Sequence, residues 1–211
     1  MNQDRLRGRL FEWGQTATED EKEVAEKVYE YESTYFDDMR FEPDSITGDF
    51  FALEIQDDSG KWQKVYEDTP SFISLSASYI FKISRIRGAM GRCYPKKHII
   101  CIHPKYKTDK TIILHEMIHA YEFILLETPL GRTLRDILYI RLYNSLKPKI
   151  KDIDKLIMAH AHILEQKDIS ERGGYHGILF YLKSLDLDLR LDLKPGTVCG
   201  YGRDIYTGEE I

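Results

Sequence analysis

The sequence lacks the features that mark membrane-spanning, secreted and repetitive proteins. No apolar run approaches the roughly 18 residues that span a bilayer, and residues 1–9 contain no apolar core of a signal peptide. No internal repeat or low-complexity segment occurs. We therefore expect a cytoplasmic protein, or a nuclear one if its source is eukaryotic. The 211 residues, 42% hydrophobic and 31% charged, are enough for one globular domain with a substantial core.

The chain also contains few cysteines. Cys93, Cys101 and Cys199 are an odd number, and no two of them form a C-x-x-C pair. This pattern argues against a disulfide framework and equally against a structural zinc ribbon.

Basic side chains are outnumbered in the first part of the chain and concentrated in the segment that follows. Residues 1–81 carry 19 acidic and 8 basic side chains, whereas residues 82–110, the basic segment, carry 9 basic and 1 acidic. The nine cations are Lys82, Arg85, Arg87, Arg92, Lys96, Lys97, Lys105, Lys107 and Lys110. Such a segment fits contact with nucleic acid or an acidic substrate, and equally a solvated face of strands and turns. Because the rest of the chain carries a net charge of −13, we expect at most weak DNA binding through residues 82–110.

Local patterns predict a helix and a hairpin near the N-terminus. Thr18 and Glu21 form a capping-box pattern, and an apolar stripe at helical spacing follows to about residue 35. Residues 50–56 and 62–66 alternate on either side of an Asp-Asp-Ser-Gly stretch, which predicts a β-hairpin. Residues 72–83 fit a strand in their first half and also fit a short helix.

The next part of the chain predicts a turn, a strand and a helix. Gly88 and Gly91 bracket the turn, and residues 98–103 form a short apolar strand closed by proline. Asp109 is the predicted N-cap of a helix over residues 110–126.

Helices are predicted for most of the remaining residues. Pro129 ends the preceding helix in this interpretation, and apolar stripes predict two more helices over residues 131–146 and 149–166. A last helix is predicted to open at Tyr175, and the tail beyond residue 196 is predicted to be irregular or strand-like.

The helix predicted at residues 110–126 contains an H-E-x-x-H motif. His115 and His119 are four residues apart and share one helix face, where two imidazoles can bind one zinc ion. A catalytic zinc takes a third protein ligand and leaves its fourth position to water, whose pKa falls to about 7. Glu116 is then placed to act as general base toward that water. The flanking residues are apolar, and a buried glutamate beside two buried histidines calls for a compensating ion.

The motif itself does not identify the third ligand. Glu122 and Leu125 stand where a metzincin needs glycine and histidine, so that class is excluded. The remaining candidates are Glu165, Glu171, His98, His103, His160, His162 and His176. His160 and His162 point to different faces of a helix, so at most one of them can face the ion. We favour His176, which follows two glycines that permit close backbone approach and precedes an apolar helix.

Three stretches of the chain carry the resemblance to a known family. They are the glycine-containing turn at residues 85–93, the motif Leu114-His115-Glu116-Met117-Ile118-His119-Ala120, and His176-Gly177-x-x-Phe180. Together they resemble the SprT-like zinc metallopeptidases, a family that includes the Spartan proteases of DNA–protein crosslink repair. The resemblance covers residues 85–120 and 173–183, and the first 70 residues carry no signature of the family.

This resemblance implies an α+β, minigluzincin-like zinc metallopeptidase domain with a small mixed sheet packed on the H-E-x-x-H helix. It implies His115, His119 and His176 as zinc ligands and Glu116 as general base. Residues 1–211 would form a single domain, with a helix and hairpin in residues 1–70 and an inserted helical pair in residues 127–170.

The chain departs from the family in two ways. About 56 residues separate His119 from His176, and we expect the inserted helices to cover or reshape the cleft. The cysteine zinc ribbon of many bacterial members is absent, which leaves nucleic-acid recruitment to the basic segment or to nothing.

Three functions fit these residues. A zinc-dependent endopeptidase would use Glu116 to move the proton, Tyr175 or an arginine to stabilise the oxyanion, and the strand at residues 98–103 to pair with an extended substrate. A non-catalytic zinc-containing module would bind nucleic acid or protein, and a third class would hydrolyse a non-protein substrate. Glu116 favours catalysis over the binding module, because a structural site has no use for a base beside an open coordination position.

Overall fold

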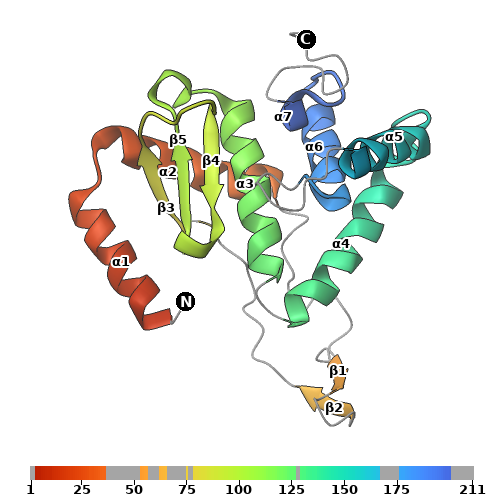
Figure 1. Ribbon diagram of the computed structural model, residues 1–211, viewed down its shortest axis with the longest axis horizontal. Helices are drawn as coiled ribbons and strands as arrows, with labels where there is room; N and C mark the ends of the chain where they lie inside the picture. The colour runs from red at the N-terminus through yellow and green to blue at the C-terminus, as the bar shows by residue number, and fades with distance from the viewer. Residues whose placement is uncertain are drawn as a thin grey trace.

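A long buried helix, α3 (Lys110–Leu126), lies at the centre of the computed structural model. The structure describes residues 3–36, 53–56, 62–65, 75, 78–126, 129–166 and 176–200. A three-stranded sheet lies on one side of α3, and α4, α6 and α7 lie on the other (Figure 1). Every residue from Ile112 to Tyr121 is buried, which explains why this helix is apolar nearly all round. The observed fold is therefore α+β, with the H-E-x-x-H helix packed against the sheet.

Two helices precede the sheet, α1 (Gln3–Thr16) and α2 (Glu19–Tyr35). The predicted capping box opens α2: the Thr18 hydroxyl accepts the Glu21 N–H at 3.3 Å, and the Glu21 carboxylate accepts the Thr18 N–H at 3.0 Å. The predicted end of this helix near residue 35 is also confirmed. Helix α1 was not predicted, because its sequence is mostly polar.

The strands form two separate sheets. The predicted hairpin is confirmed as β1 (Leu53–Gln56) paired antiparallel with β2 (Trp62–Val65). The larger sheet has the order β3-β5-β4, with β3 parallel and β4 antiparallel to the central strand. Its strands are β3 (Ile80–Ile83), β4 (Gly91–Tyr94) and β5 (Ile99–Ile102). Single-turn 3₁₀ helices follow two of them, η3 (Pro95–Lys97) after β4 and η4 (Pro104–Tyr106) after β5.

The strand predicted at residues 98–103 is confirmed as β5, but the role we expected for it is wrong. Strand β5 lies between β3 and β4, so both of its edges are already hydrogen-bonded and neither can pair with a substrate. One edge of the sheet is β4, where the sequence predicted only a turn bracketed by Gly88 and Gly91. This strand is short and begins with glycine, so it carries almost no β-strand signal.

Side chains from the N-terminal helices occupy the opposite edge of the sheet. Trp13 of α1 donates its indole N–H to the Phe81 carbonyl at 2.9 Å, and its ring packs edge-on against the Phe81 ring. The Ile83 N–H donates to the carboxylate of Glu21 in α2 at 3.4 Å. These contacts satisfy outward-facing backbone groups of β3 and leave β4 as the edge next to α3.

The helical half contains α4 (Pro129–Leu146), α5 (Ile153–Gln166), α6 (Ile178–Arg190) and α7 (Thr197–Gly200). Pro129 opens α4 instead of ending α3, as suits a residue that fits the first helical turn. Helix α6 begins at Ile178 and not at Tyr175, so His176 precedes the helix. Residues Thr197–Gly200 form a short helix, α7, where an irregular or strand-like tail was expected, and the rest of that tail lies outside the described residues. None of the helices among the described residues combines the length and apolar character that a membrane span requires.

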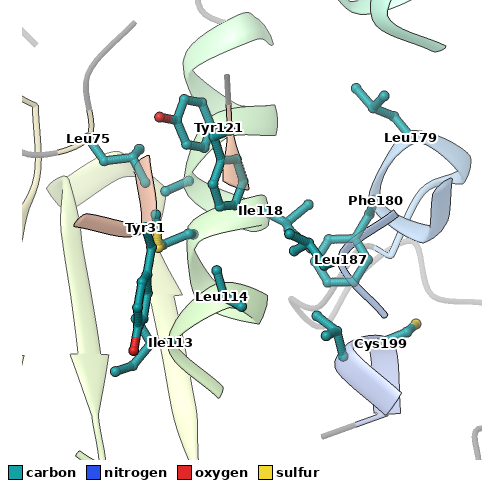
Figure 2. Packing of buried hydrophobic residues seen from close by; sticks show 14 of the residues in the cluster. Tyr31, Leu75, Ile113, Leu114, Ile118, Tyr121, Leu179, Phe180, Leu187 and Cys199 are labelled. Carbon is teal, nitrogen blue, oxygen red and sulfur yellow. The ribbon is translucent and has the colours of Figure 1, made fainter. Parts of the chain in front are cut away.

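The core forms on both sides of α3. Ile113 and Tyr121 lie on the side of Tyr31 and Leu75, whereas Ile118 reaches toward the side chains of α6 (Figure 2). The predicted N-cap is confirmed, because the Asp109 carboxylate accepts the N–H groups of Thr111 at 3.0 Å and Ile112 at 3.3 Å. Packing on two sides and a capped start fix the position of α3, and with it the orientation of its histidines.

Candidate metal centre

His115, His119 and His176 come together in a single group. Their ligand atoms all lie within 4.8 Å of one another, and the Nε2 atoms of His115 and His176 are 3.2 Å apart. Two imidazole nitrogens that bind one tetrahedral zinc ion at about 2.0–2.1 Å must lie roughly 3.3 Å apart. The observed spacing therefore fits a zinc ion between these rings. No fourth histidine, cysteine or carboxylate among the described residues joins the group.

The protonation of these rings also suits a metal ligand. The Nδ1 of His115 donates to the Val198 carbonyl at 2.8 Å, because a carbonyl can only accept, so Nε2, the atom that faces His176, is the unprotonated nitrogen of this ring. Burial, and then the neighbouring histidines, hold the pKa of His115 well below its usual value. Burial and His176 lower the pKa of His119 to about 3. Both rings are therefore neutral at pH 7, the form that binds metal.

Phe180 of α6 packs against all three imidazoles. Its ring centroid lies 4.8 Å from that of His115, 4.5 Å from that of His119 and 4.4 Å from that of His176. The Phe180 side chain is fully buried and offers no polar atom. It therefore forms an apolar wall that limits how far the three rings can turn.

Asp188 of α6 holds the backbone that orients His115. Its buried carboxylate accepts the Gly196 N–H at 2.7 Å and the Val198 N–H at 2.9 Å. Burial raises the pKa of Asp188 to about 6, against the effect of these N–H donors. The bonds anchor the start of α7, whose Val198 carbonyl accepts the His115 N–H.

The Asp188→Ala variant should lose about 2–4 kcal/mol of unfolding free energy, because it leaves buried N–H groups without an acceptor. Urea denaturation of the metal-free protein measures this loss. Asp136→Ala, at an exposed position of α4, is the control and should stay within about 0.5 kcal/mol of the parent. Equal stability of the two variants would contradict an anchoring role for Asp188.

Glu116 lies against the first residue of the edge strand. Its side chain is buried, and a Cβ atom built on Gly91 would stand 2.7 Å from both its Cγ and its Oε1. Only glycine permits this approach. Cys93, two residues along β4, is near the same carboxylate, since burial and then the charge of Glu116 raise the pKa of its thiol. The glutamate of the motif is thus held between α3 and β4.

The Gly91→Ala variant should displace the Glu116 carboxylate, because the new methyl group would occupy its position. Alanine suits the strand backbone, so we expect a stable protein that keeps its metal. A misplacement of ~1 Å at a reacting group can cost ~10²-fold, and we expect any metal-dependent hydrolysis at this site to slow by about 10- to 100-fold. Gly14→Ala in α1, where a methyl group meets nothing within 4 Å, is the matched control. Full activity of Gly91→Ala would show that the close approach is not needed.

Glu122 contributes a further contact that the sequence did not reveal. Its carboxylate accepts the Phe180 N–H in the first turn of α6, a helix whose N-cap, Gly177, offers no side-chain oxygen. Burial raises the pKa of Glu122 to about 7, against the effects of this N–H and of Arg135. Glu122 therefore links α3 to the helix that follows His176. The signal that the sequence offers for this contact is a charged residue inside an apolar helix.

The other four candidate histidines do not join the group. His98 packs against Tyr79 with the ring planes inclined by 40°, His103 caps η4, His160 is buried in α5 and His162 is exposed on the same helix. The Glu165 side chain, Glu171 and the proposed oxyanion donor Tyr175 lie outside the described residues.

The basic segment is partly offset by acidic and polar groups of α2. Lys82 lies 3.6 Å from Glu21, Lys107 pairs with Asp20, and Lys110 donates to the Tyr35 hydroxyl. The other six cations, Arg85, Arg87, Arg92, Lys96, Lys97 and Lys105, are exposed. The positive surface is therefore smaller than the sequence alone implied.

Comparison with known protein families, with curated proteins and with solved structures finds no match for this chain.

Proposed function

We propose that this protein is a zinc-dependent endopeptidase of the H-E-x-x-H type. The observation that carries the proposal is the three-histidine group, which lacks a fourth protein ligand among the described residues and has Glu116 on the same helix. Structural zinc sites usually close with four protein ligands, whereas catalytic sites keep one position open for water or substrate. The open position and the adjacent glutamate therefore favour hydrolysis over a structural role.

In this proposal the residues have separate roles. His115, His119 and His176 hold the ion, which when bound lowers the pKa of a water molecule and polarises the scissile carbonyl. Glu116 takes a proton from the nucleophile and delivers it to the leaving amine, as a general base and then a general acid. Gly91 keeps the carboxylate close to β4, and Phe180 keeps the imidazoles in place.

We propose β4 as the strand that binds the substrate backbone. The Met90 carbonyl accepts the His103 backbone N–H at 2.8 Å. In the antiparallel pairing that continues from there, every second residue of β4 turns its N–H and C=O groups toward β5. Gly91 and Cys93 therefore turn their N–H and C=O groups away from β5. An extended peptide can add to such an edge through its main chain, which gives broad side-chain tolerance.

The motifs support a place among the SprT-like metallopeptidases. Both H-E-x-x-H and the later H-G-x-x-F contribute to one centre here, the first through its histidines and the second through His176 and Phe180. An insertion between α3 and α6 would keep the ligand arrangement of that family and change only the helices between the ligands.

A cleavage assay with removal and return of the metal tests the proposal. The zinc-loaded protein is incubated with an unfolded, fluorescently labelled polypeptide, then with a chelator, and finally with added zinc. We expect cleavage that stops on chelation and returns with the metal. Tight zinc binding without cleavage of any polypeptide would overturn the peptidase assignment and favour the binding module or a non-protein substrate.

We further propose weak, sequence-independent binding of DNA by the exposed part of the basic segment. Affinity should then fall with salt along a log–log slope of about −0.9 per phosphate contacted on duplex DNA. A titration with a fluorescent duplex at several salt concentrations measures the slope. A lack of binding at low salt would reject the proposal.

A variant and its control separate local contacts from net charge. The test variant replaces Arg85, Arg87, Lys96 and Lys97 with alanine. The control replaces four exposed lysines near the start of α5 with alanine, namely Lys147, Lys149, Lys151 and Lys155. Only the test variant should flatten the slope, and both should retain zinc. An equal loss in both variants would indicate a response to net charge alone.

A further inference from the structure

His160, on the inserted helix α5, contacts the backbone of His176. Its Nε2 atom lies 2.8 Å from the His176 carbonyl oxygen. Because the carbonyl can only accept, Nε2 carries the proton and donates it. The Nδ1 atom is buried and has no hydrogen-bond partner among the described residues. The hydrogen bond to His176 is therefore the polar contact that accounts for a histidine at this position.

The His160 ring is held in the orientation that this bond requires. It stacks on the ring of Tyr181 in α6, with centroids 4.2 Å apart and planes inclined by 6°. Both side chains are buried, Tyr181 almost completely. The stacked pair fixes α5 against α6 and directs Nε2 at the chain just before that helix.

His176 lies where such support is needed. It precedes the first residue of α6, and the adjoining N-cap, Gly177, has extended backbone torsions with φ −63° and ψ 175°. The other two histidines of the group lie within the buried stretch of α3, residues 112–121. The hydrogen bond from His160 adds a constraint to His176, the one histidine of the group that lies outside a helix.

We infer that His160 is a positioning residue for the third metal ligand, and that α5 supports the metal centre instead of covering it. The inference rests on the proposed metal site. Residues that hold a ligand in place commonly contribute 10- to 100-fold in metal affinity or activity. We expect an effect at the lower end of this range, because His160 acts on the His176 backbone and not on its imidazole.

Two substitutions separate the hydrogen bond from the packing. His160→Phe keeps an aromatic ring to stack on Tyr181 but removes the donor. His160→Gln keeps an N–H donor at a similar distance from the backbone but removes the ring. His162→Phe, at an exposed position two residues along α5, is the control for a new aromatic side chain.

Zinc affinity is measured by competition with a chromophoric chelator, and the stability of each metal-free variant by thermal unfolding. We expect zinc binding to weaken about 10-fold in His160→Phe and to stay within about threefold of the parent in His160→Gln. Cobalt(II) absorption spectra give a second readout, since d–d bands respond to ligand geometry. The bands should shift in His160→Phe and match the parent in the other two variants.

Several results would overturn the inference. One is parent-like zinc affinity in His160→Phe. Another is an equal loss of zinc affinity in the Phe and Gln variants that is in proportion to their loss of stability. If His160→Phe does not fold, His160→Leu, which is smaller and also lacks a donor, is compared with His160→Gln by the same measurements. If the parent protein does not bind zinc, the proposed function is rejected. If the parent binds zinc and the Phe or Leu variant binds it equally well, only the role of His160 is rejected.

Discussion

The Glu116→Gln variant should bind zinc and fold like the parent yet lose about 10²- to 10⁴-fold in hydrolytic rate. Glutamine has nearly the shape of glutamate, so it fits the buried space beside Gly91. Its amide cannot accept the proton that a general base must take. Single-turnover cleavage of the labelled polypeptide, with zinc content measured on the same sample, checks both parts of this expectation.

Glu116→Asp is the informative comparison. It retains a carboxylate but withdraws it by one methylene from the position beside β4, so we expect activity between that of the parent and that of Glu116→Gln. Activity within a few-fold of the parent in Glu116→Gln would mean that another group is the base. An equal loss of zinc in both variants would mean that the residue supports the ligands and does not act on the substrate.

Alanine at any one of the three histidines should weaken zinc binding by more than about 100-fold, the upper range for residues that only support a ligand. Two imidazoles from α3 remain in His176→Ala, and they form an incomplete site. The metal should then no longer stabilise the fold, whereas in the parent a zinc concentration of 100 times Kd adds about 2.7 kcal/mol. Competition titrations and thermal unfolding with and without zinc measure the two effects.

His162→Ala is the control for this series, because His162 is exposed on α5 and should leave zinc affinity unchanged. An unaffected His176→Ala protein would end the assignment of the third ligand. Residual tight binding in the double variant His115→Ala/His119→Ala would place the metal elsewhere in the chain.

Sequence reasoning succeeded where the signal is local and periodic. The capping box at Thr18, the N-cap at Asp109 and the helix over residues 110–126 all depend on neighbours a few residues apart. The grouping of His176 with the H-E-x-x-H histidines was also anticipated, from the two glycines before His176, the apolar helix after it and the motif resemblance. Nothing in local chemistry indicates that residues 61 positions apart meet.

The missed features depend on tertiary contacts. Strand β4 exists because it pairs with β5 and packs against α3, while its own four residues have little preference for a strand. The hydrogen bond from His160 to the His176 carbonyl forms only because α5 packs beside the start of α6. The bond from His115 to the Val198 carbonyl forms only because α7 packs beside α3. Pro129 was misread because proline fits both the end of one helix and the first turn of the next.

No strand among the described residues pairs with the outer edge of β4, and this edge also bears on aggregation. Exposed strand edges recruit other chains, and proteins limit this by keeping such edges short, charged and interrupted by proline. Strand β4 has four residues, carries the exposed Arg92 and is followed at once by Pro95. Its edge therefore offers only a few backbone bonds to another chain. A folded protein, whose own strands are already paired, should not be captured there, and copies of this chain should not polymerise through β4.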